Sequence, residues 1–66
     1  MKNSIKVERA RFDMTQAELA REIGVSRQSI NAIEKGKYVP SAVLALKIAR
    51  LFNKPVEEIF SLEDSD

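Results

Sequence analysis

The residues with the clearest binding chemistry lie between Ser26 and Lys35, where one helical face would carry them. A helix turns by about 100° per residue, so an inward pair at Ile30 and Ile33 defines an outward face opposite. That face consists of Gln28, Asn31, Ala32 and Lys35, flanked by Arg27 and Ser29. Glutamine can form two hydrogen bonds with adenine N6 and N7, and arginine can do the same with guanine O6 and N7. The chemistry therefore suits contact with the edges of base pairs.

The segment before this face has the signature of a helix start. Thr15 and Glu18 have the spacing of a capping box, in which each side chain satisfies a free backbone N–H group. Leu19 and Ile23 would form the buried stripe of the helix, and the small Ala20 lets a second helix cross closely. A short helix is therefore predicted directly before the polar face.

A tight turn joins the two helices. Gly24 can adopt the positive φ that ends the first helix. Ser26 can cap the second, which is expected to run to about Lys35 before Gly36 stops it. This arrangement predicts a helix-turn-helix, a unit that can lay its second helix in the major groove of DNA.

The rest of the chain predicts three further helices and no strand. They are expected over about residues 4–11, with Ile5, Arg9 and Phe12 on one stripe, over 41–52, and over 56–60. Asp13 would form a bend after the first helix, and residues 61–66 would be frayed. The fold class is therefore all-α, with five helices. A single domain over residues 1–61 would precede an acidic tail over 62–66.

Composition narrows the possible functions. Sixty-six residues allow one domain, and 44% apolar with 32% charged residues suits a folded one. The absence of Cys and His excludes disulfides, thiolate or imidazole metal sites and histidine-based catalysis. No segment has the pattern of a signal peptide or a membrane span, so a cytoplasmic location is expected. No cofactor, metal or small-molecule ligand is indicated.

Charge is distributed unevenly. Residues 1–54 carry all eleven Lys and Arg against five acids, a net charge of +6, whereas residues 55–66 carry five acids and no base, a net charge of −5. A basic body suits nucleic-acid binding, and the acidic end suits solvation or masking of the basic body. On charge alone, an ordinary solvated surface with a solubilising tail fits equally well.

The motif Thr-Gln-x-Glu-Leu-Ala, followed by Gly-Val-Ser, Ser-Ile and Glu-x-Gly, resembles the phage repressor and Cro family, also called XRE-like. The resemblance runs from about Ile5 to Phe60. It implies a compact lambda-repressor-like domain that binds double-stranded DNA as a transcriptional regulator. Matched position by position, it implies that Arg27, Gln28 and Ala32 face the bases. Asn31 is added from its outward position, with spacing or backbone contact as the alternative.

The resemblance also implies contacts with the sugar-phosphate backbone. Gln16 matches a family glutamine that bonds a phosphate at a helix N-terminus, where the helix dipole favours anions. The expected phosphate-contact set is Gln16, Ser26, Ser29, Lys35, Lys37 and Tyr38. Ordinary solvation is the alternative for Gln16, Lys35 and Lys37.

Two structural roles complete the interpretation. Arg9 is anomalous on an apolar stripe, and Glu34 lies close to the inward side of its helix, so the two could form an ion pair. The resemblance supports this pairing. The C-terminal segment carries Val56, Ile59, Phe60 and Leu62, which could form the contact of a homodimer or close the monomer core.

The leading interpretation is a sequence-specific DNA-binding regulator, with repression favoured over activation. An antitoxin or adaptor that also binds a protein partner is the alternative, but the few residues after the fifth helix argue against it. An enzyme fits poorly, because no His, Cys, phosphate-binding glycine loop or carboxylate cluster is present.

Overall fold

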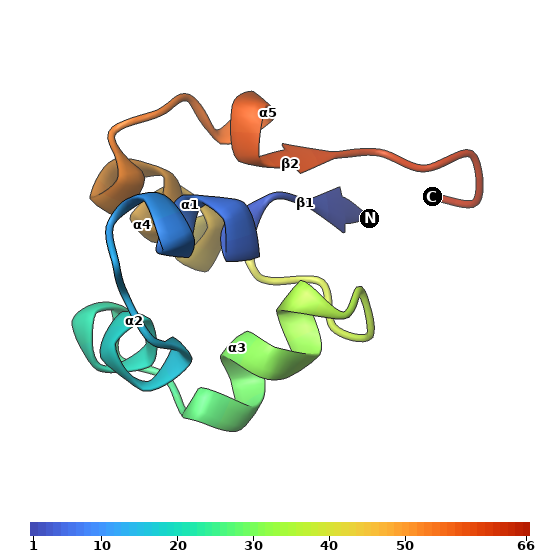
Figure 1. The fold of residues 1–66 in the computed structure, drawn as a ribbon. Coiled ribbons are helices and arrows are strands. Elements are labelled where there is room, and N and C mark those ends of the chain that lie inside the picture. Colours follow the sequence, from blue (N-terminus) through green and yellow to red (C-terminus); the bar gives the residue numbers. More distant parts are fainter.

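The computed structural model describes all 66 residues and contains five helices and one pair of short strands (Figure 1). The helices are α1 (Ile5–Arg11), α2 (Gln16–Ile23), α3 (Arg27–Glu34), α4 (Ala42–Phe52) and α5 (Val56–Ile59), and the strands are β1 (Lys2–Asn3) and β2 (Phe60–Ser61). The predicted five-helix, helix-turn-helix fold is confirmed, and each helix lies within about two residues of its expected bounds. None of the helices has the length and apolar character needed to cross a membrane.

Side chains from the chain itself cap the helices as the sequence indicates. The Thr15 hydroxyl accepts a hydrogen bond from the Glu18 backbone N–H at 3.0 Å, and the Thr15 backbone N–H donates to Glu18 Oε1 at 2.8 Å. Ser26 and Ser41 accept in the same way at the starts of α3 and α4. Gly24, with φ of +77°, ends α2. These caps set where each helix of the helix-turn-helix begins.

One apolar core lies between the helices. Its buried members are Ile5, Leu19, Ala20, Ile23, Ile30, Ile33, Leu44, Ile48, Ala49, Phe52, Ile59 and Phe60. Every helix contributes to this list, so α3 is held by the same core that holds the other four. Each large aliphatic side chain removed from water contributes about 1.5–3 kcal/mol before conformational entropy is subtracted. The core therefore orients α3 through its inward pair, Ile30 and Ile33.

The prediction of helices only was wrong, and Ser61, which was expected to begin a frayed end, lies in a strand. Strands β1 and β2 pair antiparallel, with Lys2 opposite Ser61 and Asn3 opposite Phe60 (Figure 1). The backbone N–H of Ser4 also donates to the Ile59 carbonyl at 2.9 Å. Farther along, Asp66 accepts from the Met1 amino group at 3.2 Å. Two residues are too few to show the alternating pattern by which a strand is predicted from sequence. Their pairing also depends on two distant segments meeting, which no local pattern reveals.

The inward stripe of α1 also differs from its prediction. Phe12 is 50% exposed and contacts Phe52 at a ring-centroid distance of 5.6 Å, whereas Glu8 is only 3% exposed. The Glu8 carboxylate accepts from Lys54 Nζ at 2.9 Å and from Arg11 Nη1 at 3.2 Å. Glu8 and Arg9 lie three and four residues after Ile5, so helical spacing places both beside it. Only the position of Lys54, the partner of Glu8, shows that Glu8 is the more deeply buried of the two. The pair joins α1 to the segment between α4 and α5.

Candidate nucleic-acid interface

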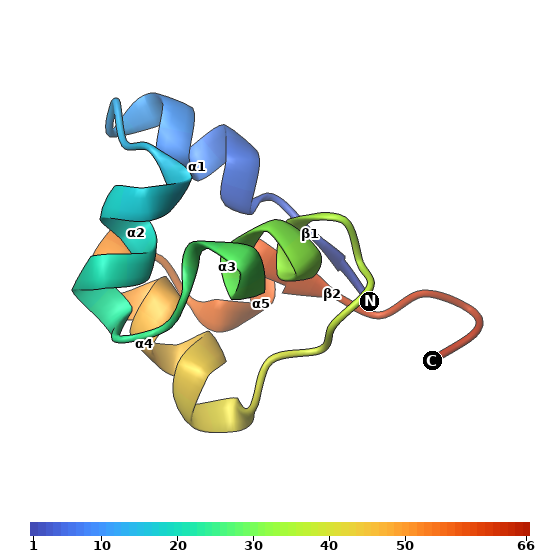
Figure 2. The same ribbon diagram turned by 90° about the horizontal axis from the view of Figure 1, so that it is seen from below.

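The recognition surface is the side of α3 that faces away from the core. Ile30 and Ile33 are 0% and 1% exposed, while Arg27 and Gln28 lie open to solvent and Asn31 and Ala32 are partly exposed. Figure 2 shows α3 on an outer face of the molecule, with α2 beside it and the loop after α3 at its far end. The structure thus brings together on one surface the four residues that were predicted to face bases.

The first turn of α3 is ordered by two serines. Ser26 Oγ accepts from the Ser29 backbone N–H at 3.1 Å, and the two hydroxyls lie 2.9 Å apart. No hydrogen bond or ion pair within the protein uses the side chain of Arg27 or Gln28, so both remain available to a ligand. The serines predicted to contact phosphate therefore have a local role in starting the helix as well.

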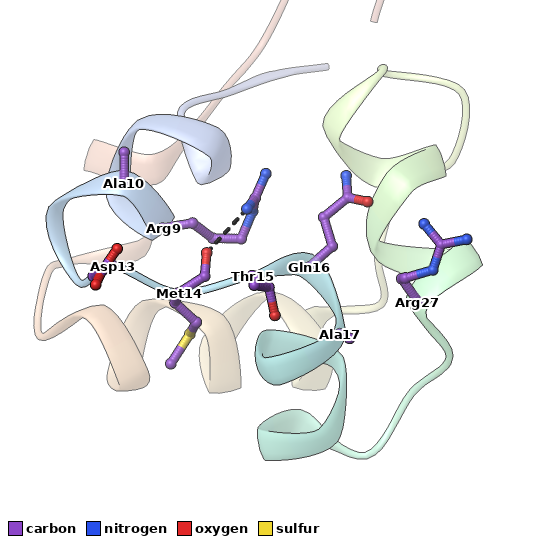
Figure 3. Close-up of a pocket in the computed structure, with 8 residues that line it drawn as sticks. All are labelled: Arg9, Ala10, Asp13, Met14, Thr15, Gln16, Ala17 and Arg27. Carbon is purple, nitrogen blue, oxygen red and sulfur yellow. Dashed lines mark hydrogen bonds between the residues drawn. The ribbon is translucent and has the colours of Figure 1, made fainter.

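An ion pair connects α1 to the end of α3. Arg9 Nε donates to Glu34 Oε2 at 2.6 Å, Arg9 Nη2 donates to Glu34 Oε1 at 3.0 Å, and Arg9 Nη1 donates to the Met14 carbonyl at 3.0 Å (the last bond is drawn in Figure 3). The Arg9 and Glu34 side chains are 14% and 8% exposed. Two parallel bonds between a guanidinium and a carboxylate fix direction as well as distance. The pair links α1, the loop after it and α3.

Gln16 is engaged inside the helix-turn-helix. Its Nε2 donates to Glu34 Oε1 at 3.1 Å and to Asn31 Oδ1 at 3.3 Å. Both hydrogens of this amide group are thereby used. A phosphate oxygen is an acceptor, so the Gln16 side chain could bond a phosphate only after giving up one of these contacts.

The start of α2 provides other donors. The backbone N–H groups of Gln16 and Ala17 have no partner within the protein, as expected for the first turn of a helix. They border a pocket of about 500 Å³ lined by Arg9, Ala10, Asp13, Met14, Thr15, Gln16, Ala17 and Arg27. Figure 3 shows Gln16 and Arg27 at one side of this pocket and Asp13 at the other. Free amides beside a guanidinium suit an anion such as phosphate.

Cations gather at the other end of α3. Lys35, Lys37 and Tyr38 are exposed, and neither lysine forms an ion pair. The Lys37 backbone N–H donates to the Ala32 carbonyl at 2.9 Å, which closes the helix end. A second pocket, of about 260 Å³, brings Lys6 of α1 to Lys35 and Asn31. Lys6 was missed from sequence, because nothing in its local pattern shows that α1 crosses near the end of α3.

Comparison with known proteins places this geometry in a family. A family model described as helix-turn-helix matches residues 5–59. The chain belongs to the XRE-like helix-turn-helix family. This is a class of DNA-binding regulators and not of enzymes.

Several relatives are similar along the whole chain. An uncharacterised HTH-type transcriptional regulator of Methanocaldococcus jannaschii is 54% identical over 66 residues, covering 100% of both chains. One of Bacillus subtilis is 50% identical, again over 100% of both. A solution structure of the SOS-response transcriptional repressor LexA from Eubacterium rectale superposes with a TM-score of 0.79 and 27% identity, over 94% of this chain and 66% of that one.

For this helix-turn-helix protein, the two alternatives for the C-terminal apolar residues, a dimer contact or the monomer core, apply to different residues. Ile59 and Phe60 are 2% and 8% exposed, because both fill the core of the monomer, and they have almost no surface left for a partner. Val56 is partly buried against the same core, while Leu62 is 78% exposed. The short fifth helix was expected to have surplus apolar surface, but Ile59 of α5 and Phe60 of β2, the strand that pairs with β1, are both buried in the core.

Proposed function

We propose that this chain is a cytoplasmic, sequence-specific transcriptional regulator that occupies a palindromic operator as a dimer, with α3 in the major groove. The carrying observation is that the outer face of α3 presents unpaired Arg27 and Gln28 while its inner face is fixed by the core and by Glu34. Exposed and unpaired donors of this kind suit base-edge contacts. Repression is proposed before activation, because occupying a promoter blocks it sterically without any further contact.

Base reading is assigned to the first half of α3. The Arg27 guanidinium suits guanine O6 and N7, and the Gln28 amide suits adenine N6 and N7. The Ala32 methyl group, partly exposed on the same side, suits contact with a thymine methyl. These three residues, together with Asn31, form the proposed base-reading set.

Phosphate contacts are assigned to both ends of the helix-turn-helix. At the start of α2, the free N–H groups of Gln16 and Ala17 would bind one phosphate, with the Gln16 side chain beside it. At the end of α3, a second cluster would follow the DNA backbone. Its members are Lys35, Lys37 and Tyr38, joined by Lys6, while Ser26 and Ser29 would lie at the groove edge. Such contacts set register and salt dependence more than sequence preference.

Selection of bound sequences from a random DNA pool, repeated at two salt concentrations, tests the proposal. An enriched inverted repeat with half-sites about one helical turn apart is expected. Salt-sensitive binding without any enriched sequence would instead make the protein a non-specific DNA binder.

Two variants separate reading from anchoring. Gln28→Ala should relax base preference at one position per half-site, at a cost of about 1–3 kcal/mol for the preferred base. Lys37→Ala should weaken all sequences similarly and reduce the slope of log K against log salt by about one per site. Competition binding with an operator and its point variants measures both, and equal effects on specificity would contradict the assignment.

A further inference from the structure

A chain of hydrogen bonds runs from the interior of the protein to the surface of α3. It begins at Arg9, whose guanidinium is held against the Glu34 carboxylate by two bonds of 2.6 and 3.0 Å. It continues from Glu34 to the Gln16 amide at 3.1 Å, and from that amide to Asn31 at 3.3 Å. Its four members come from α1, α2 and α3.

The direction of every bond in this chain is set by the first. The Arg9 guanidinium can only donate, so Glu34 is held as an acceptor. A carboxylate that accepts must be met by the NH2 end of the Gln16 amide and not by its oxygen. The same NH2 group then faces Asn31, which must offer its oxygen in return. The buried ion pair therefore determines which way both amides are turned.

These hydrogen-bond directions determine which atom of the Asn31 amide is left without a partner. With Oδ1 bonded to Gln16, Asn31 Nδ2 has no partner in the protein, and it is not a buried atom. Asn31 is partly exposed and lines the pocket that also contains Lys6 and Lys35. A free asparagine can turn either a donor or an acceptor toward DNA, but here Gln16 holds the oxygen and the NH2 group is the end without a partner.

We propose that Arg9, Glu34 and Gln16 hold Asn31 as a donor-only reader of one base position in each half-site. The bases with a major-groove acceptor are guanine, adenine and thymine, whereas cytosine presents only its N4 donor. Asn31 therefore excludes cytosine from the strand it contacts, and Gln16 is a positioning residue for this discrimination. The proposal rests on the proposed function, since it requires α3 to lie in the major groove.

Selection of bound sequences with Asn31→Asp tests the polarity. The aspartate can still accept from Gln16, but its outward atom becomes an acceptor, so cytosine, which presents only a donor, should replace the former preference at one position. A change in relative affinity of roughly fivefold to tenfold is expected there. Gln28→Glu, the same amide-to-acid change on the same helix, is the matched control and should alter a different position. Asn31→Ser should remove preference at the Asn31 position without reversing it.

Gln16→Met tests the positioning role. Methionine keeps the length of the side chain but releases Asn31, so the Asn31 position alone should become tolerant of cytosine while the positions read by Arg27 and Gln28 are unchanged. Loss of a phosphate contact, or of a purely structural role, would weaken all sequences together without changing the preference at the Asn31 position. Thermal unfolding and circular dichroism of each variant would establish that it folds.

A spectroscopic measurement separates this inference from the function on which it rests. In the free protein, the side-chain NH2 resonances of Gln16 should show hydrogen-bond shifts that Glu34→Met, which removes one of the two acceptors, reduces, whereas those of Asn31 should resemble a solvated amide. If wild-type protein enriches no sequence, the proposed function fails, but the resonances can still support the hydrogen-bond directions from Arg9 to Asn31. If it enriches an inverted repeat but Asn31→Asp and Gln16→Met leave every base preference unaltered, or if wild type selects cytosine at the Asn31 position, the inference is overturned.

Discussion

Glu34 is the residue at which the contacts inside the helix-turn-helix converge. It receives two bonds from Arg9 and one from Gln16, and its side chain is only 8% exposed. The Arg9 guanidinium that it neutralises is 14% exposed. Desolvating two charges is costly, so the main effect of such a pair is to fix the geometry between α1 and α3 and not to add stability. Losing one partner, however, leaves the other charge buried and uncompensated, which is destabilising.

Glu34→Ala should lower the free energy of unfolding by about 3 kcal/mol, because Arg9 would keep only the Met14 carbonyl as a partner. Chemical denaturation measures this. Glu22→Ala, an exposed acid on α2 with no ion pair, is the control and should change stability by less than about 0.5 kcal/mol.

Replacing the pair by Arg9→Met with Glu34→Leu should recover much of the loss, since an apolar pair avoids the desolvation cost. Unchanged stability of Glu34→Ala would show that the pair does not brace α3.

At the scale of the helices, the capping box of α2 matters because α2 presents its first turn to the proposed phosphate. The Thr15 backbone N–H donates to the Glu18 carboxylate and lowers the pKa of Glu18 below its usual value, with a further lowering from the Thr15 side chain. A depressed carboxyl pKa stabilises the folded state at a pH above the unfolded pKa, and this contribution is lost as the pH falls through the folded pKa.

Comparing the wild type with Glu18→Gln tests this linkage, since glutamine keeps an acceptor for Thr15 without the charge. The wild type should be the more stable protein near pH 6–7, and its advantage should shrink as the pH falls below about 4.5, the usual glutamate pKa. Urea denaturation at a series of pH values measures the difference. An advantage that is constant across this range would contradict the linkage.

The arrangement of these helices also explains which sites were predictable. Caps at Thr15, Ser26 and Ser41 are local, so their residues can be recognised in the sequence without knowing the fold. The buried pair of Glu8 and Lys54 spans 46 positions, and no local pattern reveals it. Of the polar contacts between helices, Arg9–Glu34 was predicted with the support of the family resemblance and is formed in the structure, whereas Glu8–Lys54 was missed.

At the scale of the whole molecule, the C-terminal segment and the exposed apolar residues are the features to consider for a contact between two copies. The C-terminal acids follow α5 and turn back toward the N-terminus, where Asp66 meets the Met1 amino group at 3.2 Å. The exposed apolar residues outside the core include Leu62 at 78% and Leu46 of α4 at 58%. Since Ile59 and Phe60 are used by the monomer, Leu62 is the main apolar side chain left from the proposed dimer contact.

Leu62→Lys should therefore weaken binding to a full inverted repeat while leaving binding to a single half-site almost unchanged, because only dimer formation is affected. Leu46→Lys is the matched control, a similarly exposed leucine on a different element, and should affect neither. Electrophoretic mobility titrations with both DNA lengths measure this. If Leu46→Lys gave the selective loss instead, the dimer contact would lie on α4.

By itself, the sequence determined the helix-turn-helix: its caps, its turn glycine, its apolar spacing and the polar face of α3 all depend on residues a few positions apart. Only the tertiary structure decided the β1–β2 pairing, the burial of Glu8, Ile59 and Phe60, the approach of Lys6 to α3, and the orientation of the Gln16 and Asn31 amides. The physical reason is that spacing specifies which side of a helix a residue occupies, whereas partners and hydrogen-bond direction depend on which distant segments pack against that side.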